Sequence, residues 1–369
     1  MISKVMIPLV WRYLSRSYFQ TFFLSLCAFV GVLIVMRLQE IARFATSGAS
    51  PLKVVLFALF QVPYILPIAI PISCLIATLI LFHRLSFSHE LTALRSSGFS
   101  LKNIRAPLIY IATLLSLANF TIASELSPRC KALSKELIFD LVKTNPLFPL
   151  QRDSLVKLKK AYYHIGNLKD NTSAQDVLLV TKSRSNNAMT LLFAKDLHIE
   201  GEWVKGNQLA FISSMDAKKE GFGHLIIENQ HEMQIQAQSL SQFLQKVDNS
   251  MHSDYLSLHE LVAYGIAKKG SPLLCRDVLF EITRRISLGL SPLTLTLLGI
   301  AFGIQIGRSS SRTGLLKAAL LTALLLSCFI AAKSFEKMQI VALTIFLIPH
   351  PLLASLSLLK LKKVDQGVE

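Results

Sequence analysis

The chain has 369 residues, of which 52% are hydrophobic, and its formal net charge is +16. The apolar residues gather in long uncharged runs, and this clustering excludes an ordinary soluble globular protein. Lysine and arginine residues flank the runs, so the positive charge indicates membrane orientation rather than a nucleic-acid surface.

Six stretches lack Asp, Glu, Lys and Arg and are about long enough to cross a bilayer. They cover residues 17–36, 54–82, 106–124, 286–307, 318–332 and 338–359. The distribution of flanking Lys and Arg predicts that both termini are cytoplasmic and that residues 126–274 lie outside. We therefore expect three transmembrane helices in residues 1–125, an outer domain in 126–274, and three more helices in 275–369.

A polar loop joins the second and third spans at residues 84–99. It reads as a short helix over residues 88–97, in which Ser88 caps the start and Gly98 supplies a left-handed end. Leu91 and Leu94 form a narrow apolar stripe on this helix, which could dock into a groove on another protein. The alternative is a solvated turn that only connects two membrane helices.

The outer domain changes character, because alternating polar and apolar residues replace the long apolar runs. A helix is expected over residues 128–143, and a capping box at Ser257 and Glu260 predicts another helix start. Between them, at about residues 150–250, we expect an all-β sandwich or jelly roll. Its strand candidates are residues 177–180, 189–193, 209–213, 222–227 and 231–238.

The sequence has no motif typical of catalysis or of nucleotide binding. It lacks the phosphate-binding loop GxxxxGK[ST], HExxH and GxSxG, and its five cysteines have no metal-ligand spacing. We expect no catalytic residue, metal or cofactor in the chain. His350, in the sixth span, reads as a packing histidine or a proton relay, and Pro63, Pro67 and Pro71 as a packing kink or a hinge.

Four short motifs, in this order over six spans, resemble the lipopolysaccharide-export permease family LptF/LptG, also called YjgP/YjgQ. They are residues 12–16 (RYLSR), 90–98 (ELTALRSSG), 143–146 (KTNP) and 281–285 (EITRR). One departure follows the third motif, where the family often has LxxGxF and this chain has 150–155 (LQRDSL). The resemblance implies an α-helical membrane protein with six transmembrane helices and an inserted all-β, jelly-roll-like periplasmic domain.

The resemblance also implies partners. Two sister LptF/LptG-type permeases would pair in the inner membrane of a Gram-negative-type bacterium, and an LptB-type ATPase dimer would bind ATP and drive them. They would extract lipopolysaccharide from the surrounding membrane lipid and pass it to an LptC/LptA-type periplasmic bridge. The expected ATPase contacts are Glu90, Leu91, Ala93, Leu94, Arg95 and Gly98.

Residues expected at a substrate site or gate are Arg37, Arg43, Glu281 and Arg285. Arg37 is either an interfacial anchor or a phosphate ligand on a cavity wall. Glu281 and Arg285 are four residues apart, and we expect an exposed ion pair of about 0.3–0.5 kcal/mol. Two other classes remain open: another ABC-type lipid or lipoprotein export permease, usually with four spans, and a non-transport membrane scaffold with a periplasmic β domain.

Overall fold

A computed structural model describes residues 2–46, 49–144, 156–158, 161–170, 173–182, 189–200, 203–214, 225–236, 253–267, 272–304, 313–335 and 338–366. The chain divides into two compact units. The helical unit consists of Met1–Gln39, Ala58–Ala132 and Ser253–Glu369, and the sheet unit of Glu40–Phe57 and Leu133–His252. The KTNP segment at 143–146 and the 150–155 departure fall partly or wholly outside the described residues.

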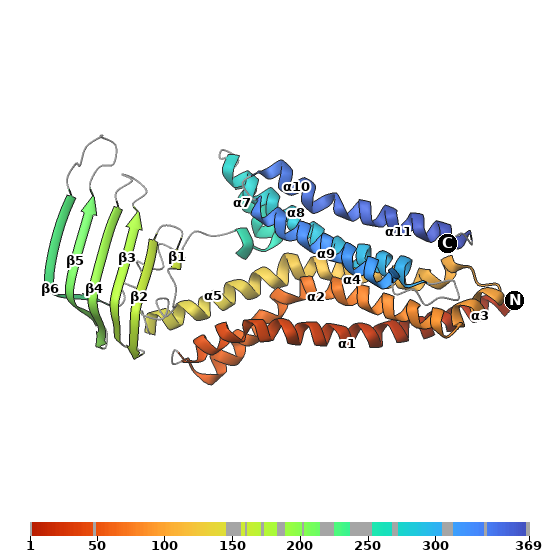
Figure 1. Ribbon diagram of the computed structural model, residues 1–369, viewed down its shortest axis with the longest axis horizontal. Coiled ribbons are helices and arrows are strands. Elements are labelled where there is room, and N and C mark those ends of the chain that lie inside the picture. Colours follow the sequence, from red (N-terminus) through yellow and green to blue (C-terminus); the bar gives the residue numbers. More distant parts are fainter. Residues whose placement is uncertain are drawn as a thin grey trace. The chain divides into compact units, whose positions relative to one another are not determined.

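The helices follow the apolar runs of the sequence (Figure 1). They are α1 (Ile2–Thr46), α2 (Pro51–Phe87), α3 (Glu90–Ser96), α4 (Leu101–Thr121), the π-helix η1 (Ile122–Leu126), α5 (Ser127–Thr144), the 3-10 helix η3 (Ser253–Tyr255), α7 (Leu258–Ala267), α8 (Pro272–Gly303), α9 (Thr313–Ser334), α10 (Gln339–Leu347) and α11 (Pro349–Asp365). Six segments are long and apolar enough to cross a membrane, and all six predicted spans are thereby confirmed.

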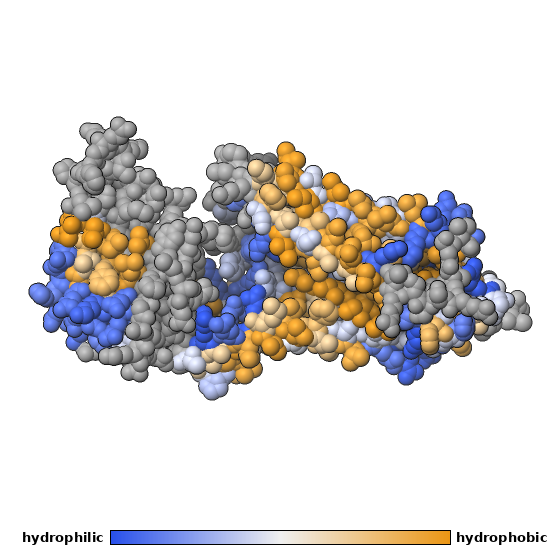
Figure 2. Space-filling model, in the orientation of Figure 1, coloured by the Kyte–Doolittle hydropathy of each residue, from blue (hydrophilic) through white to orange (hydrophobic). Residues whose placement is uncertain are grey.

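The surface of the helical unit has the distribution of a membrane protein. Figure 2 shows a broad hydrophobic band over the helices, with hydrophilic side chains gathered near α3 and the end of α11. Exposed apolar side chains on this unit include Phe23, Leu24 and Leu117. A soluble protein rarely leaves so large a contiguous apolar surface uncovered, so lipid is the natural solvent of this band.

Prolines inside the helices leave some backbone carbonyls without a helical N–H donor, and side chains from neighbouring helices donate hydrogen bonds to these carbonyls. Pro71 and Pro292 have no N–H, so the carbonyls four residues earlier lose their usual hydrogen bonds. Asn119 lies fully buried on α4, and its Nδ2 donates to both of these carbonyls, at Pro67 (3.2 Å) and Leu288 (2.7 Å). One amide thus joins α2, α4 and α8 at the points where two helices are interrupted.

A side chain from a neighbouring helix also donates to the carbonyl that a third proline leaves without a helical donor. Pro107 lies inside α4, and the carbonyl four residues before it belongs to Asn103. The indole Nε1 of Trp11 on α1 donates to this carbonyl at 3.1 Å. Because an unmet carbonyl in lipid costs several kcal/mol, these contacts allow prolines inside the spans.

Replacing Asn119 with leucine should destabilise the protein by about 2–5 kcal/mol, because two buried carbonyls lose their donor. The loss should shrink when Pro71 and Pro292 are both changed to alanine, since the backbone then supplies the missing N–H groups. Thermal unfolding of the purified chain in detergent measures both effects. Thr113→Val is the matched control, because that exposed hydroxyl bonds only Ile109 of its own helix. An equal loss in both proline backgrounds would contradict this account.

Helix α8 approaches α2 closely through two glycines four residues apart. A Cβ on Gly299 would collide with Oγ1 of Thr78, and one on Gly303 would lie 2.9 Å from Cβ of Phe82. Small residues at this spacing let helices pack backbone to backbone in a membrane. This contact places α8 in the centre of the helical unit, where Leu295, Leu298 and Ile300 are also buried.

The sheet unit carries one six-stranded antiparallel sheet in the order β1-β2-β3-β4-β5-β6. The strands are β1 (Val156–Leu158), β2 (Ala161–Asp170), β3 (Ser173–Lys182), β4 (Met189–Glu200), β5 (Trp203–Ser214) and β6 (Leu225–Gln236). Val177, Ala194 and Leu209 are register neighbours on three successive strands, and all three are buried. They form the apolar face that the alternation predicted.

The inserted all-β domain is confirmed, but its described strands differ from a jelly roll. They run as a simple meander in a single sheet, whereas a jelly roll has two sheets with Greek-key connections. Strand β2 was not predicted, and the two strands expected at 222–227 and 231–238 are one strand, β6, within its described residues.

Candidate functional site

The short helix between the second and third spans is present as α3, and its end was predicted correctly. Gly98 has a positive φ of 87°, and its N–H donates to the carbonyl of Arg95 at 3.0 Å. The predicted start is wrong. His89, in the left-handed region with φ of 58°, occupies the cap position, and Ser88 instead donates to the Arg84 carbonyl at 2.8 Å.

The apolar stripe of α3 is used inside the chain. Leu91 is buried among core residues of the helical unit, and Leu94 packs partly buried against the same cluster. This placement corrects the expectation that both leucines enter a groove on a partner. Four exposed residues of α3 and its C-cap have small side chains, and they are Thr92, Ala93, Ser96 and Ser97.

Glu90 ties α3 to the first span. Its carboxylate accepts hydrogen bonds from the Tyr13 hydroxyl at 3.0 Å and from the Ser88 hydroxyl at 3.1 Å. Arg84 Nη2 donates to the same Tyr13 oxygen at 3.1 Å. Two sequence motifs, RYLSR and ELTALRSSG, therefore meet through one hydrogen-bonded chain, which joins α3 to α1 and to Arg84 of α2.

The pair Glu281 and Arg285 lies on α8, near the end of the helical unit that holds η1 and α7. Both side chains are fully buried, which contradicts the exposed pair expected from their spacing. Glu281 Oε1 accepts from Arg285 Nε at 2.9 Å, and its carboxylate also takes two hydrogen bonds from Arg284. One carboxylate thus neutralises two guanidinium groups only in part, and the trio keeps a net positive charge.

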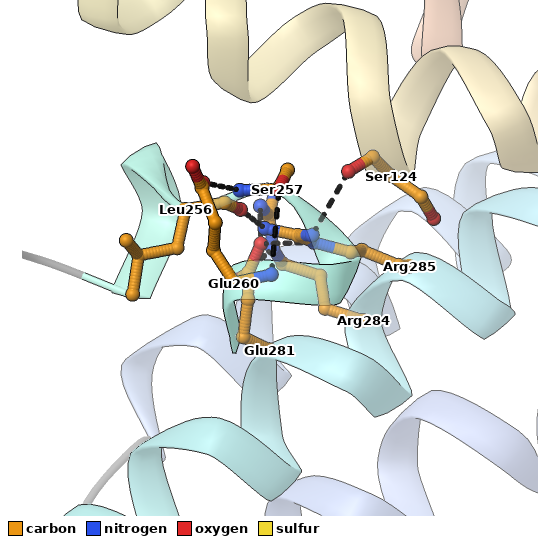
Figure 3. Close-up of polar contacts among 7 residues, drawn as sticks. All are labelled: Ser124, Leu256, Ser257, Glu260, Glu281, Arg284 and Arg285. Carbon is orange, nitrogen blue, oxygen red and sulfur yellow. Dashed lines mark hydrogen bonds and ion pairs between the residues drawn. The ribbon is translucent and has the colours of Figure 1, made fainter. Parts of the chain in front are cut away.

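Arg285 also holds two backbone segments together (Figure 3). Its Nη1 donates to the carbonyl of Ser124 in η1 at 3.1 Å, and its Nη2 to that of Leu256 before α7 at 2.8 Å. A π-helix changes the i→i−4 ladder, and this leaves a carbonyl of η1 available to a side chain. Arg285 is therefore a crosslink between α8, η1 and the start of α7.

The start of α7 is fixed by the predicted capping box, which is confirmed. The Ser257 N–H donates to Glu260 Oε2 at 2.8 Å, and the Glu260 N–H donates to Ser257 Oγ at 3.4 Å. The hydrogen bond from the Ser257 backbone lowers the pKa of the Glu260 carboxyl. This cap consequently favours folding above the ordinary carboxyl pKa and loses its effect as the pH falls through the lowered one.

A second group of cations surrounds Tyr64 of α2. The Arg37 guanidinium carbon lies 5.1 Å from the ring centroid, and Lys131 Nζ lies 4.5 Å from it. Lys131 also lies within electrostatic range of Arg284 and Glu281. We call Arg37, Lys131 and Arg284 the basic cluster. All three are partly exposed, and two carboxylates, Asp254 and Glu281, lie within electrostatic range of Lys131.

The sequence analysis named Arg37 as a site candidate but did not name Tyr64, Lys131 or Arg284. Arg284 is adjacent to the predicted residue Arg285, and Lys131 lies in the first turn of the helix expected over residues 128–143. The sequence signal that could have identified both is a positive charge close to the end of a transmembrane span. Arg43, also expected at the site, belongs to the sheet unit, where its carbonyl accepts from Thr46 Oγ1 at 3.0 Å.

His350 is a buried residue of α11, and its ring faces α8. Its Nε2 lies 2.9 Å from Ser287 Oγ, and its Nδ1 lies 3.2 Å from Thr294 Oγ1. Ser287 and Thr294 lie on α8, so both ring nitrogens face one neighbouring helix. The sequence left two roles open for His350, packing and proton relay, and this geometry favours packing.

Comparison with known proteins agrees with this layout. No curated protein matches the chain. A family model described as lipopolysaccharide export system permease LptF/LptG matches residues 12–363 of the 369. The six candidate spans also differ from the four usual in the alternative exporter class. Because the match covers nearly the whole sequence, the chain belongs to the lipopolysaccharide export permease family LptF/LptG.

Proposed function

We propose that this chain is the membrane subunit of an ABC-type exporter, and that its basic cluster binds the phosphate groups of lipopolysaccharide. Arg37, Lys131 and Arg284 carry the proposal, because Arg37 and Lys131 lie against the Tyr64 ring and Arg284 lies within electrostatic range of Lys131. Two carboxylates, Asp254 and Glu281, lie near the same cations. Arginine binds phosphate through a planar fork of donors, and lysine acts as a point charge. A phosphorylated glycolipid carries the oxyanions that these donors bind.

The energy would come from a separate ATPase at α3. The sequence has no phosphate-binding loop, so ATP hydrolysis belongs to a partner chain. Arg84, Tyr13 and Glu90 join α3 to the first two spans, and Leu91 anchors it in the core. A partner that moves α3 would therefore move membrane helices without an additional linker.

The proposed orientation places α3 and both termini in the cytoplasm and the sheet unit in the periplasm, in the inner membrane. A sister permease would complete the transport path, and the sheet would pass the glycolipid to a bridge protein. Strand β6 ends the described sheet, and a sheet edge is a common place for another protein to add a strand.

Crosslinking of lipopolysaccharide in cells tests the binding site. Arg37→Glu and Lys131→Gln should each reduce crosslinking about tenfold or more, since a charged hydrogen bond contributes about 1.5–3 kcal/mol. Arg129→Gln is the matched control. Arg129 lies two residues from Lys131 and is 69% exposed, and its charge is paired with Glu125 at 3.1 Å. Crosslinking at the wild-type level in both variants, with normal membrane insertion, would remove the cluster from the substrate path.

A further inference from the structure

A second basic site lies at the α3 end of the helical unit, away from the residues assigned to lipopolysaccharide. A pocket of about 720 Å³ opens between the end of α3, the start of α4 and the end of α11. Figure 1 shows α3 and the end of α11 at the same end of this unit. Four cations line the pocket, and they are Arg95, Lys102, Arg105 and Lys362.

The residues that line this pocket carry more positive than negative charge. Asp365 is the one acid among the lining residues, and its carboxylate lies 3.6 Å from Arg105 Nη2, too far for a hydrogen bond. Within the described part of the chain, Arg105 Nη1 is buried and has no hydrogen-bond partner. A buried guanidinium nitrogen without an acceptor is costly, so an anion at this position would satisfy both its charge and its donors.

The backbone of α4 adds to the positive electrostatic potential of the pocket. Helix α4 begins at Leu101 in the pocket wall, and the N-terminal end of a helix carries a partial positive charge. Ser100 caps this end by accepting from the Asn103 N–H at 3.3 Å. The first turn of α4 and the four cations therefore favour the same kind of ligand, a compact oxyanion such as phosphate.

The wall of the pocket also has an apolar part. Leu358 lines the pocket and is 51% exposed, and Leu359 beside it is 60% exposed. Both lie on α11 within a segment that is long and apolar enough to cross a membrane. A phosphate in the pocket would thus lie at the end of a lipid-facing surface, where the acyl chains of its own lipid can follow α11.

We propose that this pocket binds the phosphate headgroup of an anionic membrane phospholipid. Basic pockets between transmembrane helices near the membrane surface are suited to such headgroups. The bound phosphate would supply an acceptor for Arg105 Nη1, beside the ion pair of Arg105 with Asp365, and would link the end of α3 to the end of α11. This role is separate from transport of lipopolysaccharide and would hold α3 in position before a partner engages it.

Lipid titration of the purified full-length chain tests the proposal. Native mass spectrometry should show one phosphatidylglycerol retained at least tenfold more tightly than phosphatidylcholine. Arg105→Gln combined with Lys362→Gln should abolish this preference, and Asp365→Asn should strengthen it because a competing carboxylate is removed. Lys102→Gln, on an exposed side chain, should weaken it even if the double variant fails to fold.

Lys360→Gln is the matched control, because Lys360 lies on the same helix but its Nζ is 3.9 Å from the Phe302 ring centroid, outside the pocket lining. Inorganic phosphate should not displace the lipid at concentrations that leave the protein folded. Equal retention of the two lipids, an equal loss in Lys360→Gln, or complete displacement by phosphate would each overturn the proposal.

Discussion

Replacing Glu281 with alanine should lower the free energy of unfolding by about 3–5 kcal/mol, the cost of leaving a buried charge without its partner. Arg285 has no exposed surface, and the Arg284 side chain is only 20% exposed. Both guanidinium groups would lose the carboxylate that they share. Thermal unfolding in detergent should show this loss as a fall in midpoint and as reduced accumulation in the membrane.

The chain contains a matched control for this variant. Glu125 and Arg129 have the same spacing of four residues, but their side chains are 40% and 69% exposed. Glu125→Ala should therefore cost no more than about 0.5 kcal/mol. Similar losses in the two variants would show that burial at Glu281 contributes nothing, and would contradict the crosslink described for Arg285.

Variants of Arg285 distinguish a structural role of this residue from a role in transport. Its Nε, Nη1 and Nη2 reach three different oxygens, and a lysine ammonium cannot reproduce that geometry. Arg285→Lys should therefore be nearly as unstable as Arg285→Met. Export in these variants should fall in proportion to the amount of folded protein, because the buried side chain does not reach substrate.

The membrane part of the fold was predictable because one physical signal controls it. A run of about twenty uncharged residues has few alternatives to a transmembrane helix, so all six spans were found. The contacts between those helices were not predictable. Nothing local in the sequence shows that Asn119 would lie opposite the carbonyls freed by Pro71 and Pro292, because these residues are far apart in the chain.

The strands were predicted less well because alternation is a weaker signal. Strand β2 contains Gly166 and Asn167, which are turn formers, so it was missed. In β6 the polar residues Glu228–Gln230 suggested a break, but their pairing with β5 continues without one. Long-range partners decide both cases, and a window of one strand does not contain them.

The site shows the same limit. The ion pair of Glu281 and Arg285 was predicted, but its burial was not, because the sequence spacing is the same on a surface helix and on a buried one. Leu91 was assigned to a partner's groove for the same reason. An apolar stripe indicates that something covers it, and only the tertiary structure shows that the chain itself does.

Replacing Glu90 with lysine should abolish binding of the ATPase partner that we propose, while leaving the chain folded in the membrane. The carboxylate accepts from Tyr13 and Ser88, and Arg84 donates to the same Tyr13 hydroxyl. A lysine at this position brings a second positive charge towards Arg84 and removes both acceptors. If Glu90 also contacts a basic group on the ATPase, its loss would cost about 2–5 kcal/mol of association.

Three further variants separate the internal contact from the contact with the partner. Tyr13→Phe removes the two internal hydrogen bonds of the Tyr13 hydroxyl, to Glu90 and from Arg84. Glu90→Gln keeps an acceptor oxygen without the charge, and Ala93→Trp obstructs the outward face without touching the network. Co-purification of the ATPase and an export assay should show near-normal binding in Tyr13→Phe and strong losses in Glu90→Lys and Ala93→Trp. A charge reversal on the ATPase should partly restore Glu90→Lys.

The pattern of losses assigns the role of α3. If Tyr13→Phe fails as badly as Glu90→Lys, Glu90 acts only by holding α3 against α1, and the partner reads the position of the helix rather than its charge. If Glu90→Gln also fails while Tyr13→Phe does not, the charge itself crosses the interface. Wild-type assembly and export in both Glu90→Lys and Ala93→Trp would contradict the coupling role, because neither the charge nor the outward surface of α3 would then matter to the partner.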